Sequence, residues 1–212
     1  MMTFRSVKTS LENILKTEIE TGGLYEGKFQ VIGYQKEIQS AEEVVNNNRS
    51  VQVYYESGNF DGAIYGDTQH KATFKIDLTV GTSASVDLSG LDLATSDSER
   101  AAILANHKNA LAQADEKLDE LIEYVYQIIM AGKNSELGAD SVNVASRQLV
   151  DIRKNEPIPR GEYAVISATM TLECMLSESL ISVEGVESEG ITTNIEIKND
   201  DVSVTQIETG GI

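Results

Sequence analysis

The sequence is poor in several residue types that often carry chemistry. Only one cysteine, two histidines and two prolines occur among 212 residues, and tryptophan is absent. A single cysteine excludes an intrachain disulfide framework and a zinc site built on cysteines. The histidines stand in no HExxH, CxxC or EF-hand spacing. We therefore expect no metal ion and no cofactor.

Basic residues are also scarce. Lysine and arginine number 17 against 34 aspartates and glutamates, which gives a net charge of −17. DNA-binding modules and proteins that dock on anionic membranes depend on basic side chains, so the composition disfavours both classes. No apolar run approaches the roughly 20 residues that span a bilayer, and the first residues contain no apolar signal-peptide core. We expect a protein that is made in a reducing cytoplasm.

The residues that are present predict helices and strands in alternation. Apolar spacing predicts a helix over 4–20 that stops at Gly22 and Gly23, and a long helix over 97–130. A capping box of Ser96 and Glu99 opens the long helix, although its polar early half leaves a break possible.

Apolar and polar residues alternate over 51–56, 72–80 and 164–176, which predicts strands. We expect a short strand over 147–153, a loop over 57–69 and a turn-rich connection over 81–95. The segment 154–161 contains both prolines and is expected to form a stiff, extended turn. One predicted sheet face is polar and rich in threonine, and it is either exposed to solvent or faces a lumen or subunit seam: Thr73, Lys75, Asp77, Thr79, Ser167, Thr169 and Thr171.

This order of elements predicts an α+β fold. An antiparallel or mixed sheet is expected to be covered on one face by the N-terminal helix and the long central helix. The core domain is expected over 1–176, with an insertion at about 81–110. An acidic extension over 177–212 is expected to form a β-hairpin that docks on its own domain or on a partner, because a lone hairpin is marginally stable.

Few side chains suggest reaction chemistry. His70 follows Asp67 by three residues at the start of a strand, so a metal pair is conceivable, but a histidine in a surface loop is the favoured interpretation. Cys174 falls on the apolar face of its strand, where we expect a buried and inert thiol. No catalytic set with recognisable spacing occurs, so we predict a protein that is not an enzyme.

Four segments carry a resemblance to a known family. They are the opening helix FRSVKTSLENILKTEI, the strand pair around VQVYYESG and ATFKIDLTV, the long helix, and the segment RQLVDIRKNEPIPRGEYAVISATMTLEC. Over residues 3–176 the chain resembles the tail terminator, or tail-completion, proteins of long-tailed bacteriophages. The last segment is similar to the closing hairpin of that family, in which a Pro/Gly turn precedes a long strand.

The resemblance implies a structural virion protein that forms a ring, commonly a hexamer, at the head-proximal end of the tail tube. It implies three partners: further copies of the chain, the tail tube protein, and a head connector or neck protein. DNA would pass through the lumen as cargo without specific binding, and an acidic lumen would repel its phosphates.

Charged residues around the proline turn are the predicted contacts between subunits or between rings: Arg147, Arg153, Arg160 and Glu162. A tail tube, neck or baseplate subunit is an alternative function. An alternative of another class is a cytoplasmic ligand-binding module or enzyme with a pocket between the long helix and the sheet. His70 and Asp67 would be its polar residues.

Overall fold

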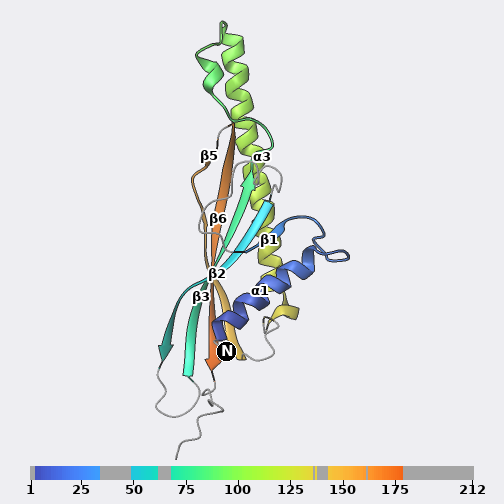
Figure 1. Ribbon diagram of the computed structural model, residues 1–212, viewed down its shortest axis with the longest axis vertical. Helices are drawn as coiled ribbons and strands as arrows, with labels where there is room; N and C mark the ends of the chain where they lie inside the picture. Colours follow the sequence, from blue (N-terminus) through green and yellow to red (C-terminus); the bar gives the residue numbers. More distant parts are fainter. Residues whose placement is uncertain are drawn as a thin grey trace, which may run out of the picture. The chain divides into compact units, whose positions relative to one another are not determined.

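The computed structural model describes residues 3–33, 49–61, 68–135, 137, 143–160 and 162–178. The chain divides after Ser179 into two units, and every described residue belongs to the first. Apart from its first two residues, the predicted C-terminal extension lies outside the described residues. The helices are α1 (Thr3–Ile19) and α3 (Asp97–Met130), with short 3₁₀ turns η1 (Ser89–Leu91) and η2 (Gly132–Asn134). The strands are β1 (Gln30–Ile32), β2 (Arg49–Asp61), β3 (Thr68–Gly81), β4 (Asn143–Lys154), β5 (Ile158–Arg160) and β6 (Tyr163–Glu178) (Figure 1).

The strands form one six-stranded mixed sheet in the order β1-β2-β3-β6-β4, and β5 pairs with β6 as well. Only the β1–β2 pairing is parallel among these strands. Both α1 and α3 pack on one face of the sheet and share a single apolar core with it. The predicted α+β fold is therefore confirmed.

The alternation of apolar residues places the core between the sheet and the two helices. The side chains of β3 and β6 that face the helices are fully buried at their central positions, as are the apolar residues of α1 and α3 that face the sheet: Phe74, Ile76, Leu78, Met170, Leu172, Leu11, Leu15, Leu118 and Leu121. Each such side chain contributes about 1.5–3 kcal/mol by leaving water. This burial holds the helices on that face.

Helix α3 begins at the predicted capping box. The backbone N–H of Glu99 donates to the Ser96 hydroxyl at 3.2 Å, and the Ser96 N–H donates to the Glu99 carboxylate at the same distance. The helix continues without a break for 34 residues. At 1.5 Å per residue it is about 50 Å long. Its buried residues begin only at Ala110, so the first turns pack little against the sheet.

Ion pairs from two strands fasten α3 to the sheet on both sides of the helix. Arg49 of β2 lies 2.6 Å from the Glu120 carboxylate. Lys154 at the end of β4 lies 2.7 Å from Asp115 and 2.8 Å from Asp119. Basic residues of the sheet thus neutralise part of the acidic surface of α3.

Three predictions at the strand ends need correction. The expected loop over 57–69 is wrong in part, because β2 continues to Asp61 and β3 begins at Thr68, with a register shift between Tyr55 and Ser57 that keeps the strands paired. The expected short strand over 147–153 is the longer β4. The proline segment is only partly a turn, since its residues Ile158–Arg160 form β5.

Candidate assembly surfaces

The second face of the sheet is polar, as the alternation predicts. The Lys75 ammonium donates to the Thr171 hydroxyl at 2.9 Å, and the Thr169 hydroxyl donates to the Asp77 carboxylate at 2.7 Å. An ion pair of 2.9 Å joins Lys71 to Glu173. No helix in the described part of the chain covers this face. Polar contacts between neighbouring strands therefore connect the side chains of this surface, which we call the polar face.

Charges of both signs occur on the polar face. The basic residues Lys71, Lys75 and Arg153 lie among the acidic residues Glu56, Asp77, Asp151 and Glu173. The large acidic excess of the chain is therefore not concentrated on this face. A surface of mixed sign attracts phosphates weakly and repels them weakly.

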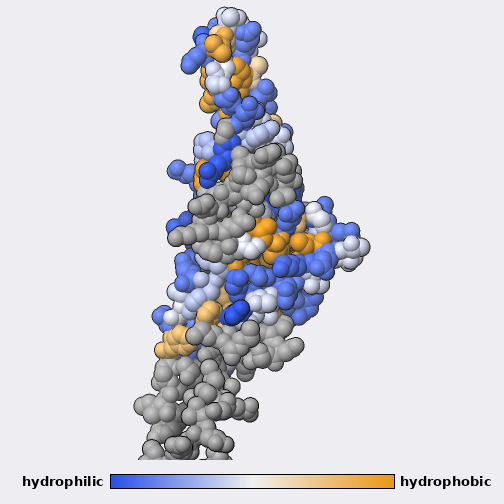
Figure 2. Space-filling model, viewed as in Figure 1, coloured by the Kyte–Doolittle hydropathy of each residue, from blue (hydrophilic) through white to orange (hydrophobic). Residues whose placement is uncertain are grey.

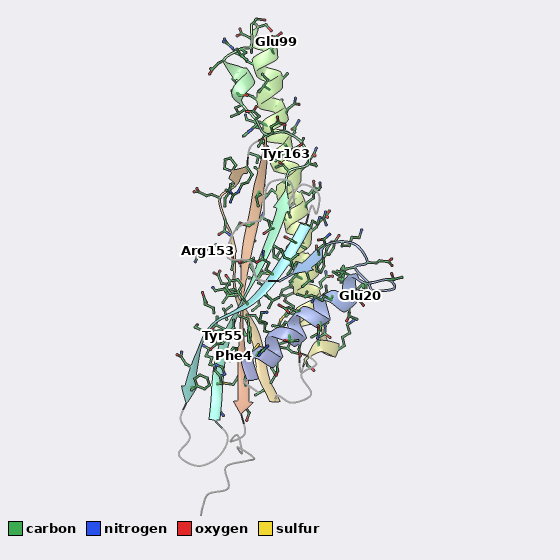
Figure 3. All side chains as sticks on the ribbon, viewed as in Figure 1. Phe4, Glu20, Tyr55, Glu99, Arg153 and Tyr163 are labelled. Carbon is green, nitrogen blue, oxygen red and sulfur yellow. The ribbon has the colours of Figure 1, made fainter. Side chains whose placement is uncertain are left out.

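The four charged residues predicted around the proline turn do not form one cluster. Arg147 and Arg153 lie on β4 and Arg160 lies on β5, and their partners on β6 are, in that order, Cys174, Thr169 and Tyr163. The first and last partners are eleven positions apart on β6, which corresponds to about 36 Å at 3.3 Å per residue. Only Arg160 and Glu162 lie together, at the β5–β6 turn. Figure 3 shows the exposed Arg153 well away from Tyr163. A role of these residues in subunit contacts stays a prediction.

Arg147 lies on the helix-covered side of β4 and contacts the end of α3. Its guanidinium Nη2 donates to the Ala131 carbonyl at 2.8 Å. Burial lowers the pKa of Arg147 from its ordinary value. Burial raises the pKa of the neighbouring Cys174 thiol to about 12, although Arg147 acts in the opposite direction. Cys174 is fully buried, so the prediction of a buried thiol is confirmed.

Both edges of the sheet are largely unpaired among the described residues. The outer side of β4 faces no described strand over its 12 residues. On the opposite side, among the described strands, β1 pairs with β2 only from Ser50 to Gln52. Val150 and Ile152 of β4 are 43% and 42% exposed. Open edges of this length are templates for pairing with another chain.

A helical projection extends beyond the sheet, close to the predicted insertion at 81–110. It consists of residues 83–109, which include η1 and the first turns of α3 (Figure 1). At its base the Val86 N–H donates to the Glu162 carbonyl at 2.7 Å, and His107 Nδ1 lies 2.8 Å from the Val86 carbonyl. Leu93 is 83% exposed and Leu104 is 41% exposed. Figure 2 shows apolar patches among polar ones at this end.

His70 is buried, so its assignment to a surface loop is wrong. Its ring stacks on Phe60 with 3.9 Å between centroids, and its Nε2 lies 3.4 Å from the Tyr55 hydroxyl. Phe4 of α1 completes this aromatic cluster by stacking on Tyr55 at 4.2 Å (Figure 3). Asp67 lies outside the described residues. His70 therefore serves the packing between α1 and the sheet.

Between the long helix and the sheet, where a pocket is predicted as an alternative, Leu118 and Leu121 are fully buried core side chains. A cavity of about 310 Å³ lies elsewhere, between α1 and the η2 turn. It is lined mainly by polar side chains, and its Lys133 is ion-paired with Glu18: Ser10, Asn13, Ile14, Thr17, Glu18, Lys133, Asn134 and Leu137. His70 is not part of this lining.

No group of three or more His, Cys, Asp or Glu side chains within the described ranges is arranged to hold a metal ion. Neither helix described here combines the length and apolar character of a membrane span.

Comparison with protein-family models gives no match to this chain, and comparison with curated proteins gives none either. The class of protein therefore follows from fold and surfaces alone. In its described part it is an α+β protein with one helix-covered sheet face, one polar face, and a β4 edge that pairs with no further described strand.

The sequence analysis did not identify the open edge of β4. Asp151, Ile152 and Arg153 alternate in the sequence like residues of any half-buried strand. Their position at the edge depends on the long-range pairing of β4 with β6. One available signal is that residues 132–142, which precede β4, show no apolar alternation typical of a further strand.

Proposed function

We propose that this protein is a structural subunit that assembles into a closed ring, of the tail terminator type that its sequence resembles. In that role it would cap the head-proximal end of a phage tail tube and join it to the head connector. The observation that carries the proposal is the arrangement of the described strands: β4 ends the sheet on one side with no described strand beyond it, and on the other side the three-residue β1 is the last described strand.

Ring closure needs a heterologous interface, in which two different surfaces of identical subunits meet and the rotation closes. β4 lies at one end of the described strand order, and β1 with β2 lies at the other, and the two sides differ in sequence, so one subunit would offer β4 to the β1–β2 side of the next. Such pairing would also remove edges that are an aggregation hazard in a free protein.

The arrangement of elements supports the same role. The segments that carry the resemblance form α1, the β2–β3 pair, α3 and the β4–β6 region in one sheet-and-helix unit. The polar face, with charges of both signs, is suited to line a water-filled lumen through which DNA slides, because it offers no cluster of basic side chains to hold phosphates.

A self-polymerising tail tube subunit is a second candidate, since the same open edges would serve it. The two functions are separated by light scattering at several concentrations combined with negative-stain images, with and without tail tube protein. Closed rings, or rings at the tips of added tubes, are expected for a terminator. Long tubes from this protein alone would assign it to the tube. A protein that stays monomeric and does not bind tube protein would overturn both.

A further inference from the structure

A short stretch of β4 is complementary to itself. Asp151 and Arg153 lie on the polar face, opposite Thr171 and Thr169 of β6, and Ile152 between them lies on the other face. An acid and a base thus flank an apolar residue symmetrically. An antiparallel strand of the same sequence, centred on Ile152, would place an acid opposite a base on each side.

The backbone at this stretch is oriented for such pairing. The Asn155 N–H donates to the Ser167 carbonyl at 2.9 Å, so residue 155 and, two residues earlier, Arg153 turn their backbone groups toward β6. In an antiparallel ladder the orientation alternates, so Ile152 and Lys154 turn their N–H and C=O groups outward. These groups meet no strand among the described residues.

The side chains at this edge are exposed and weakly engaged. The Arg153 side chain is 77% exposed and that of Asp151 is 50% exposed, and the two are 3.8 Å apart within one chain. Ile152 is 42% exposed although it is a large apolar residue. The acidic residues Asp115 and Asp119 of α3 lie on the same side of the molecule, but Lys154 already pairs with both.

We propose that a second copy of this chain pairs with β4 through a two-fold axis at Ile152. In this isologous interface the Ile152 residues of the two copies form a hydrogen-bonded pair. Asp151 of each copy then lies directly opposite Arg153 of the other, on the polar face, in a non-hydrogen-bonded pair where side chains approach closely. The two six-stranded sheets become one continuous sheet.

The pairing is weak and sensitive to salt. The register shift between Leu149 and Asp151 leaves Val150 as an extra residue, which shortens the regular part of the edge. Exposed charge pairs are screened as ionic strength rises. We therefore expect dimers at tens of micromolar protein in low salt, and a higher dissociation constant in 0.5 M NaCl.

The inference does not depend on the proposed ring. It concerns the free protein, without tube protein present. A two-fold pair is closed, so it uses the β4 edge without allowing further subunits to add. The pair and a ring that uses β4 are mutually exclusive, and the pair would keep free subunits from premature assembly.

The test uses two single variants of the full chain, Asp151→Arg and Arg153→Asp. Each variant places like charges opposite each other at two positions of the pair, so each alone is expected to be monomeric by sedimentation velocity. An equimolar mixture of the two restores both acid–base contacts and is expected to form one-to-one heterodimers. The double variant, which exchanges the two charges, is expected to form homodimers like the wild type. Circular dichroism checks that the variants remain folded, since both residues are exposed.

Cysteine cross-linking tests independently which residues of the two β4 strands lie opposite each other. The native Cys174 is buried, so Ile152→Cys introduces the accessible thiol. Directly opposed residues have Cα atoms about 5.5 Å apart, within the range for a disulfide. Ile152→Cys is therefore expected to form a covalent dimer under mild oxidation, whereas the matched control Val150→Cys, which faces Lys154 of the second copy, is expected to do so at least tenfold more slowly.

A monomeric wild type in low salt, a mixture that does not form heterodimers, or equal cross-linking at both positions would overturn the inference. Because no tube protein is used, that outcome would leave the proposed ring untouched.

Discussion

The two faces of β3 and β6 are built from the same strands but are stabilised in different ways. On the helix-covered face, side chains such as Phe74 and Leu172 are fully buried under α1 and α3. On the polar face, hydrogen bonds such as Thr169 to Asp77 join neighbouring strands, with no helix above them in the described part of the chain. The first face holds the fold together through apolar burial, and the second is joined by polar contacts between strands.

The largest expected difference between the two faces is in chemical reactivity. Cys174 is on the covered face, and burial raises the pKa of its thiol to about 12, so at pH 8 only about one molecule in 10⁴ carries the reactive thiolate. The neighbouring Met175 belongs to the polar face. A thiol placed there by Met175→Cys is expected to react with a disulfide reagent at least 10³-fold faster than Cys174.

The absorbance of the thiolate that the reagent releases gives the reaction rates of both cysteines in one experiment, because the variant carries both thiols. Denaturant serves as the control, since it should bring the two thiols to similar rates. Rapid reaction of Cys174 in the folded protein would mean that the covered face opens readily, which contradicts a single packed core.

The next largest difference concerns stability. Phe74→Ala removes a fully buried ring from the core and is expected to lower the free energy of unfolding by about 3–5 kcal/mol. Thr73→Ala changes the adjacent residue on the polar face and is expected to cost less than about 1 kcal/mol. Urea denaturation of both variants measures the two values. Similar losses for the two substitutions would show that the polar face is as important for stability as the core.

A smaller effect on the free energy of unfolding is expected from the cross-strand hydrogen bonds of the polar face. The hydrogen bond of 2.7 Å between Thr169 and Asp77 joins β6 to β3. A double-mutant cycle with Thr169→Val and Asp77→Ala is expected to give a coupling energy of about 0.5–1.5 kcal/mol. Thr79 and Ser167 face each other on the same two strands without a side-chain hydrogen bond between them, and they provide the matched control cycle. A coupling energy of zero between Thr169 and Asp77 would mean that the side chains of the polar face stabilise the sheet independently of one another.

The sequence predicted the fold well where local patterns decide the structure. The alternation in 72–80 and 164–176 identified both the strands and their buried faces, and Ser96 with Glu99 located the start of α3. These features depend on side-chain period and capping, which neighbouring residues determine by themselves.

The remaining features depend on contacts between distant segments. His70 is buried because Phe60 of the paired strand stacks on it, and because Gly58 leaves room: a Cβ there would lie 2.1 Å from the His70 Nε2. Gly58 falls in the segment 57–69 that the sequence predicts as a loop. Likewise, the charged residues near the prolines looked clustered, but pairing with β6 spreads them along a sheet edge.

The smallest expected effect lies outside both faces, at the start of α3. Figure 3 shows Glu99 at the far end of the helical projection. Backbone and side-chain hydrogen bonds from Thr95, together with the Ser96 N–H, lower the pKa of Glu99 from its ordinary value of 4.5. Because the folded-state pKa is depressed, this contribution to stability is present above pH 4.5 and is lost as the pH falls through the lower, folded-state value.

Glu99→Gln replaces the carboxylate by a neutral group of the same shape. At pH 7 the variant is expected to be slightly less stable than the wild type in thermal unfolding, and the difference should shrink as the pH is lowered below 4.5, because the wild-type carboxyl is then progressively protonated. Glu116→Gln, an exposed site on the same helix, serves as the control. A difference that stays constant as the pH falls from 7 to well below 4.5 would mean that the shape of the cap, and not its charge, holds the first turn. Neither outcome should alter the packing of either sheet face, because buried residues of α3 begin only at Ala110.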